Sequence, residues 1–292
     1  MIRSAIFCIL ILLSACGKKD EAFDTTQDSA SYALESATAL LGSLANDAEN
    51  SSSLMSRDLN ATAACSIATA RSTCDGNIIT VSWPNCTLAL GNNNVTLSGG
   101  WRNTYNDGVA CTTARSSGLA SGDSFTRNYL DFGVTFPFGR RLTTSSNAHS
   151  AYDGTAIPAT GVTVTNVAGT RQITIQGLRR ILAGSKGAKF FDHSITSSAI
   201  AVTGTRAAGT RLVNSGNLTV YHNLVGYKAV SSFSSVRWGE ATCCFPTSGR
   251  VTTTFSGSLS GNAELVFGPS CGTATFTDTE GMSEAVTLSH CE

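Results

Sequence analysis

Charged residues are scarce in this chain. Lys, Arg, Asp and Glu make up 14% of the 292 residues, and the formal net charge is zero. A strong overall excess of positive charge, which is typical of nucleic-acid-binding proteins, is therefore absent, and we expect no specific recognition of nucleic acid. Only five prolines occur, so long stretches can form uninterrupted β-strands.

Long apolar runs are also absent after the start of the chain. A helix that crosses a membrane needs about 20 apolar residues. The one marked apolar run, residues 5–13, is shorter, follows Arg3 and precedes the small residues Ser14 and Ala15. That order predicts a secretory signal segment over residues 1–15.

The end of this segment, Leu13-Ser14-Ala15-Cys16, resembles the lipobox of bacterial lipoproteins. The resemblance implies that Cys16 becomes the lipidated mature N-terminus and anchors the protein in a membrane. Gly17 after this cysteine resembles lipoproteins that are sorted to the outer membrane. We therefore expect the N-terminal lipid to make the membrane a partner of this protein. The expected location is the bacterial outer membrane, with the periplasmic or surface face left open.

Cysteines are frequent, and eight remain after Cys8 and Cys16 are set aside. They form two clusters: Cys65, Cys74, Cys86 and Cys111, then Cys243, Cys244, Cys271 and Cys291. An even count in an exported chain predicts disulfides. Zinc sites usually show a Cys-x2–4-Cys spacing, which does not occur here, so we expect neither a metal nor a cofactor.

The adjacent cysteines suggest a specific pairing in the second cluster. Neighbouring side chains on a strand point to opposite faces, so the two should bond different partners. We expect Cys244 to pair with Cys271 and Cys243 with Cys291. Connectivity within residues 65–111 stays open.

Hydrophobic periodicity predicts one helix followed by many strands. Residues 31–48 carry an apolar stripe at helical spacing, which predicts an amphipathic helix after a polar tether. From about residue 63 the period changes to two. Alternating segments include residues 78–83, 86–90, 162–165, 172–176, 218–221, 251–255 and 263–267. Asn106-Asp107-Gly108 and Asp278-Thr279-Glu280-Gly281 are typical hairpin turns.

These patterns predict a mostly-β fold. We expect an antiparallel meander sheet or sandwich with one N-terminal amphipathic helix and two disulfide clusters. The expected domains are the signal at 1–15, the lipidated cysteine, tether and helix at 16–62, and a β ectodomain at 63–292. A subdivision of the ectodomain is expected near 155–160.

The C-terminal part, residues 244–288, resembles a β module of uncharacterised envelope lipoproteins. The motifs are Cys244-Phe245-Pro246-Thr247-Ser248-Gly249 and Phe267-Gly268-Pro269-Ser270-Cys271. Cys243 beside Cys244, and Pro269, depart from the pattern. The resemblance implies a meander sheet pinned by a disulfide, and no activity.

No catalytic motif stands out. Gly122-Asp123-Ser124 occurs in two hydrolase families, but Phe125 follows it and the partner motifs of those families are missing. His193 lies between Asp192 and Ser194, which on a strand would point away from it. We expect no catalytic residues and no enzymatic activity, with an envelope hydrolase as the weakest alternative.

Charge is distributed unevenly along the chain. Residues 126–250 hold thirteen Lys or Arg and four acids, whereas residues 20–60 and 251–292 are acidic. A basic sheet face would bind a polyanion, and arginine suits bidentate contacts with phosphate or carboxylate. Our candidate polyanion-binding residues are Arg140, Arg141, Arg179, Arg180, Lys186 and Lys189. The simpler alternative is a solvated face that discourages aggregation.

Together these patterns predict a lipid-anchored envelope protein of structural, adhesive or ligand-binding type. A polyanion- or glycan-binding surface module that uses the basic 126–250 segment is the main alternative. Exposed tryptophans would favour glycans, although Trp83, Trp101 and Trp238 fit core positions better. A protein partner is the remaining alternative.

Overall fold

The computed structural model describes residues 71–90, 93–205, 208–239 and 242–288, together with Ala33 and Ala37. The expected signal segment, Cys16, Cys65 and Cys291 lie outside these residues. So does the helix expected over 31–48, except that Ala33 and Ala37 are helical and buried.

The described chain is mostly β, as the periodicity predicts, and it divides into two units. The first unit contains residues 71–196 and 221–226, and the second contains residues 197–220 and 227–288. The chain therefore passes from the first unit to the second between Thr196 and Ser197, and residues 221–226 return to the first unit. The position near 155–160, where we expected a subdivision, falls inside the first unit.

The first unit is a sheet with strand order β1-β2-β3-β4-β5-β9-β10, in which β8 pairs with both β4 and β9. Its strands are β1 (Arg71–Asp75), β2 (Ile78–Leu90), β3 (Asn93–Tyr105), β4 (Ser124–Thr135), β5 (Arg141–Ser145), β8 (Val162–Val167), β9 (Thr170–Ala183) and β10 (Lys189–Ser197). The helix α3 (Cys111–Ser117), the 3-10 turn η2 (Pro137–Gly139) and the pair β6 (His149–Ser150) and β7 (Ala156–Ile157) complete it. These strands pair with their neighbours in antiparallel fashion.

Two details of the first unit differ from the sequence-based expectation. The turn at Asn106-Asp107-Gly108 does not join two strands directly, because α3 intervenes between β3 and β4. Residues 78–83 and 86–90 form one strand, β2, with a register shift between Trp83 and Cys86.

The second unit is a meander of β14 (Tyr227–Trp238), β15 (Ser248–Gly257), β16 (Gly261–Phe267), β17 (Thr273–Thr277) and β18 (Ser283–Thr287). It also contains β11 (Ile200–Thr203) and β12 (Arg211–Ser215), while β13 (Asn217–His222) has its last two residues in the first unit. Four strands contribute one buried row: Phe233, Val251, Leu265 and Phe276. Glu264 points to the other face, as alternation predicts.

Two disulfides are complete within the described residues, and each joins cysteines of one predicted cluster. Cys74 pairs with Cys111, which ties α3 to β1, and Cys243 pairs with Cys271. Cys86 and Cys244 are also disulfide-bonded. Confinement to clusters is thus confirmed for the two complete bonds.

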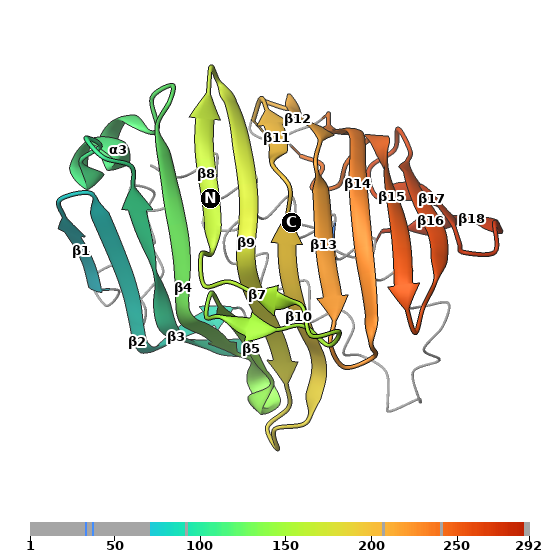
Figure 1. Cartoon of the computed structure of the whole chain (residues 1–292), viewed down its shortest axis with the longest axis horizontal. Coiled ribbons are helices and arrows are strands. Elements are labelled where there is room, and N and C mark those ends of the chain that lie inside the picture. The colour runs from blue at the N-terminus through green and yellow to red at the C-terminus, as the bar shows by residue number, and fades with distance from the viewer. Residues whose placement is uncertain are drawn as a thin grey trace. The chain divides into compact units, whose positions relative to one another are not determined.

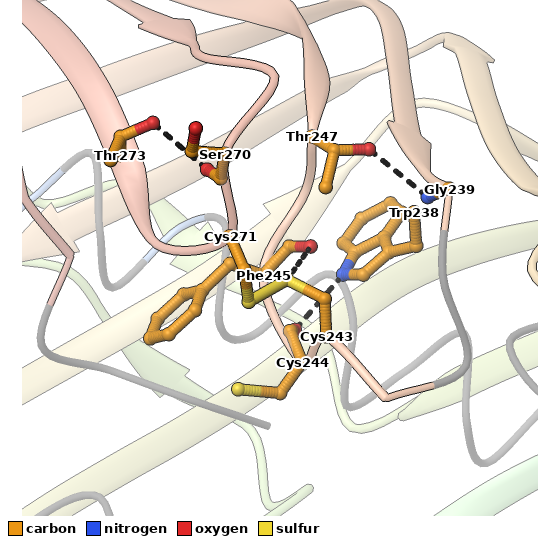
Figure 2. The surroundings of a disulfide bond; sticks show 9 residues. All are labelled: Trp238, Gly239, Cys243, Cys244, Phe245, Thr247, Ser270, Cys271 and Thr273. Atoms are coloured by element: carbon orange, nitrogen blue, oxygen red, sulfur yellow. Dashed lines mark hydrogen bonds between the residues drawn. A yellow bond between two sulfur atoms is a disulfide. The ribbon is translucent and has the colours of Figure 1, made fainter.

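The expected pairing of Cys244 with Cys271 and Cys243 with Cys291 is wrong. Both adjacent cysteines lie in the loop between β14 and β15, so strand alternation does not govern their side chains. The Trp238 indole N–H donates to the Cys244 carbonyl at 3.2 Å, while buried Cys243 faces Cys271. Figure 2 shows the Cys244 side chain pointing away from this disulfide.

Candidate anion-binding site

Three adjacent strands of the first unit hold most of the predicted basic residues. Cross-strand register places Arg141 of β5 opposite Ala183 of β9, and Ala183 opposite Lys189 of β10. Four residues away along β9, Arg179 lies opposite Ser145 and Ser194. Because side chains alternate along a strand, Arg141, Arg179 and Lys189 share one face. Neighbouring strands are about 4.8 Å apart, so Arg141 and Lys189 are separated by about 10 Å.

The ends of these strands carry two further cations. Arg140 immediately precedes β5, and Lys186 lies in the turn between β9 and β10, whose paired ends project at the bottom of Figure 1. Lys186 is exposed, and the Arg140 guanidinium lies 5.0 Å from the centre of the Phe190 ring. We call Arg140, Arg141, Arg179, Lys186 and Lys189 the basic cluster.

Asp192 lies within the basic cluster as a buried counter-charge. Its carboxylate accepts two hydrogen bonds from Arg179, at 2.9 and 2.7 Å, and one from Lys189 at 2.7 Å. Asn223 donates a fourth at 3.2 Å. Burial alone would raise the pKa of Asp192, but these hydrogen bonds outweigh it and hold the pKa well below its ordinary value. Asp192 is therefore a permanent anion that fixes Arg179 and Lys189 in place.

Arg180, the sixth predicted residue, lies on the opposite face of β9. It pairs across the strands with His193, whose ring stacks on Phe191 at 4.6 Å and meets His222 edge-on at 4.2 Å. Burial is the main cause that lowers the pKa of His193 well below 6.5, and it lowers the pKa of His222 to about 3. Both imidazoles are thus neutral packing groups. The predicted separation of His193 from Asp192 and Ser194 holds.

Ser194 and His149 have a geometry that would activate a nucleophile if substrate could reach it. The His149 Nδ1 lies 2.8 Å from the Asn147 carbonyl, which can only accept, so in the neutral imidazole Nε2 accepts from the Ser194 hydroxyl at 2.9 Å. Asn223 also donates to that hydroxyl at 2.9 Å. Ser194 has no exposed surface, however. The bonds link β10 to the neighbouring loops and offer no reactive group at the surface.

The other sequence candidates have local roles. Trp238 is fully buried, and the Arg127 side chain covers Trp101 at 4.6 Å from the ring centre, so these two tryptophans do not form a glycan platform. In the Gly122-Asp123-Ser124 segment, the Asp123 carboxylate accepts a hydrogen bond from the Ala120 N–H. This contact closes a turn before β4.

The sequence did not predict three residues at the basic cluster. These are Asp192, which is the buried counter-charge, and Phe138 and Phe190, whose rings are exposed. The acid was visible in the sequence, but its contact with Arg179 depends on the register of β9 and β10. Nothing in the sequence pattern distinguishes an exposed phenylalanine from a core one.

Neither the arrangement of the side chains nor comparison with known proteins assigns a chemistry to this site. Across the described ranges no group of three His, Cys, Asp or Glu is arranged to hold a metal ion. In the same part of the chain no helix is both long and apolar enough to cross a membrane. No family model, curated protein or solved structure matches this chain.

Proposed function

We propose that this protein is a lipid-anchored component of the bacterial envelope that binds an anionic polymer through the basic cluster and has no catalytic role. Cys16 is the proposed anchor, in the outer membrane. The observation that carries the proposal is the register of β5, β9 and β10, which gathers Arg141, Arg179 and Lys189 on one face.

The charge balance of the first unit supports this function. Between residues 132 and 191 the chain contains seven Lys or Arg and a single acid, Asp153. Asp192 offsets one positive charge of the basic cluster and leaves an excess of four among the residues named. Because the chain as a whole is neutral, attraction of a polyanion depends on this local excess and not on net charge.

The side-chain types and their fixation also support binding of phosphate or carboxylate groups. Three of the five cations are arginines, whose planar guanidinium forms paired hydrogen bonds with such groups. Asp192 holds Arg179 and Lys189 in defined positions, so less side-chain entropy is lost when a ligand binds.

The proposal is tested by a salt series on immobilised heparin, lipopolysaccharide and duplex DNA with the mature chain from residue 16, carrying Cys16→Ser to prevent lipidation. Duplex DNA serves as a polyanion of known charge density. We expect steep loss of affinity with salt. The double variant Arg141→Ser/Lys186→Ser should reduce the slope of log affinity against log salt on DNA by about two.

A matched control is Arg171→Ser, because Arg171 lies on the same strand β9 near its opposite end. It is eight residues from Arg179, the member of the basic cluster on this strand, or about 27 Å along the strand. The control should keep the wild-type slope. Absence of retention at low salt, or an equal effect of Arg171→Ser, would refute polyanion binding and leave a structural or protein-partner role, to be sought by cross-linking on intact cells.

A further inference from the structure

Two phenylalanines next to the basic cluster are exposed to solvent. Phe138 is 96% exposed and Phe190 is 55% exposed. We call these two rings the aromatic tip. Phe138 lies at the centre of η2, the connection between β4 and β5, and Phe190 is the second residue of β10. An aromatic ring with nearly all of its surface in water forfeits the stabilisation that burial gives, about 1.5–3 kcal/mol.

Local backbone geometry turns both rings outward. Phe138 adopts the left-handed conformation with φ 66° and ψ 13°, which is unfavourable for a bulky side chain. Phe190 falls in a register shift, because Lys189 pairs with Ala183 and Phe191 with Leu182, leaving Phe190 without a partner across the strands. Such a bulge redirects a side chain. Both exposed rings thus lie at departures from regular backbone structure.

The two rings belong to one surface. A Cβ added to Gly139 would lie 2.7 Å from the Ser185 Cβ, so the η2 connection contacts the turn between β9 and β10. The Arg140 guanidinium packs over Phe190. Lys186 lies in the same turn. The aromatic tip therefore lies beside Arg140 and Lys186 of the basic cluster.

We propose that the aromatic tip inserts into the interfacial layer of an anionic membrane while the basic cluster binds its phosphate headgroups. This inference rests on the proposed function and identifies an anionic lipid surface as the polyanionic ligand of the basic cluster. A membrane presents negative charge outside an apolar layer, and the tip presents apolar rings beyond a set of cations, so the two surfaces are complementary.

A soluble polyanion or glycan would use the cations but would not explain the exposed rings of the aromatic tip. Phenylalanine has no hydrogen-bonding group to orient a sugar, and a free polyanion gains nothing from the ring of Phe138. An anchor on Cys16 would hold the protein at the same membrane, and tethering raises the effective concentration of a weak second contact. The aromatic tip would then set the orientation of the first unit on the membrane.

The test measures co-sedimentation of the mature Cys16→Ser chain with vesicles. Phosphatidylglycerol-containing vesicles are compared with phosphatidylcholine vesicles, and heparin binding is measured in parallel. Wild type should prefer the anionic vesicles. Phe138→Asn should bind them about tenfold more weakly and keep its heparin affinity. Asparagine tolerates the left-handed conformation, so this variant should be at least as stable as wild type.

Two companion variants complete the design. Phe138→Trp should bind the anionic vesicles at least as well as wild type, because tryptophan favours the membrane interface. Met282→Ser removes another exposed apolar side chain, 68% exposed and located in the second unit, and should change nothing.

The outcomes separate the two proposals. Heparin binding without vesicle binding, or equal vesicle binding by Phe138→Asn and wild type, overturns the membrane contact and keeps polyanion binding. A loss with Met282→Ser as large as that with Phe138→Asn also overturns it. If neither heparin nor anionic vesicles are bound, both proposals fail.

Discussion

Asp192 and His193 are neighbours in the chain, yet they lie on opposite faces of β10 in opposite electrostatic conditions. Asp192 is held as an anion by Arg179, Lys189 and Asn223. His193 is enclosed by rings and by burial that keeps it neutral. A single strand therefore separates a charged network from an apolar one.

Because the pKa values of His193 and His222 are lowered in the folded state, we expect the protein to lose stability in acid. The folded-state pKa values of His193 and His222 lie below 6.5, so the unfolded chain binds protons that the folded chain does not as pH falls below that value. Stability contributed by the pair is complete above about pH 6.5 and decreases at lower pH; for His222, whose pKa is lowered to about 3, the loss is about 2 kcal/mol at pH 5. The pKa of Asp192 is also lowered, so the folded protein loses further stability as the pH falls below 3.8, the ordinary pKa of an aspartate.

Urea unfolding at pH 7 and pH 5 measures this effect. His222→Phe should reduce the difference in unfolding free energy between the two pH values by about 2 kcal/mol. Asp153→Asn, a change at an exposed carboxylate of the same unit, should leave the difference unchanged. An unaltered pH dependence in His222→Phe would contradict the assignment.

At the scale of single residues, the sequence shows which side chains are charged but does not predict which residues they contact. The uneven distribution of arginine pointed to Arg141 and Arg179, which the structure places on one face. Arg180 was grouped with them, although alternation puts it on the other face beside His193. Which face carries which cation depends on register and on the bulge at Phe190, and neither is encoded by a local pattern.

Among the elements, β9 is constrained by one glycine. Gly177 has φ 136°, and a Cβ there would lie within van der Waals overlap of the Pro158 carbonyl oxygen. It also coincides with a register shift, since Leu178 pairs with Ile195 and Gln176 with Thr196. The loop before β8 therefore approaches β9 closely at Gly177, which has no side chain to block it.

Gly177→Ala should destabilise the protein by roughly 3 kcal/mol, because the methyl group meets backbone that cannot move independently. Gly187→Ala is the matched control: its φ is 81° and nothing lies within 4 Å of the added carbon. The control should lose only about 1 kcal/mol through backbone strain. Chemical denaturation of both variants measures the difference, and equal losses would show that the close approach at Pro158 is unimportant.

Strands with clear alternation were predictable, and α3 was not. Residues 162–165, 172–176 and 251–255 fall within β8, β9 and β15. The sequence of α3 has no apolar stripe, and a disulfide from Cys111 to Cys74 holds it. Where a covalent bond replaces hydrophobic packing, periodicity carries no signal.

At the scale of the whole molecule, the two disulfides that lie entirely within the described residues fall in different units. Cys74–Cys111 lies in the first unit and Cys243–Cys271 in the second. The two cysteine clusters were visible in the sequence and predicted this grouping. The boundary at Thr196 and Ser197 was not predictable, because the short connection between β10 and β11 carries no distinct composition.

Removal of one disulfide should therefore affect one unit. Cys243→Ser/Cys271→Ser opens a loop with a sequence separation of 28 and should destabilise the second unit by about 3–4 kcal/mol. Hydrogen exchange followed by mass spectrometry should show faster exchange in β14 to β17 and unchanged exchange in β2 to β4. Cys74→Ser/Cys111→Ser should give the reverse pattern, and uniform acceleration in either variant would contradict separate stabilisation.

Because Phe138 adopts the left-handed conformation, selection for stability and selection for membrane binding should favour different residues at this position. Glycine or asparagine at this position would relieve the backbone strain and remove an exposed ring, so a library screened for heat resistance alone should replace this phenylalanine early. A library screened for retention on anionic vesicles should keep an aromatic residue there. Comparing the residues recovered from the two screens would reveal what this position contributes without knowledge of the natural ligand.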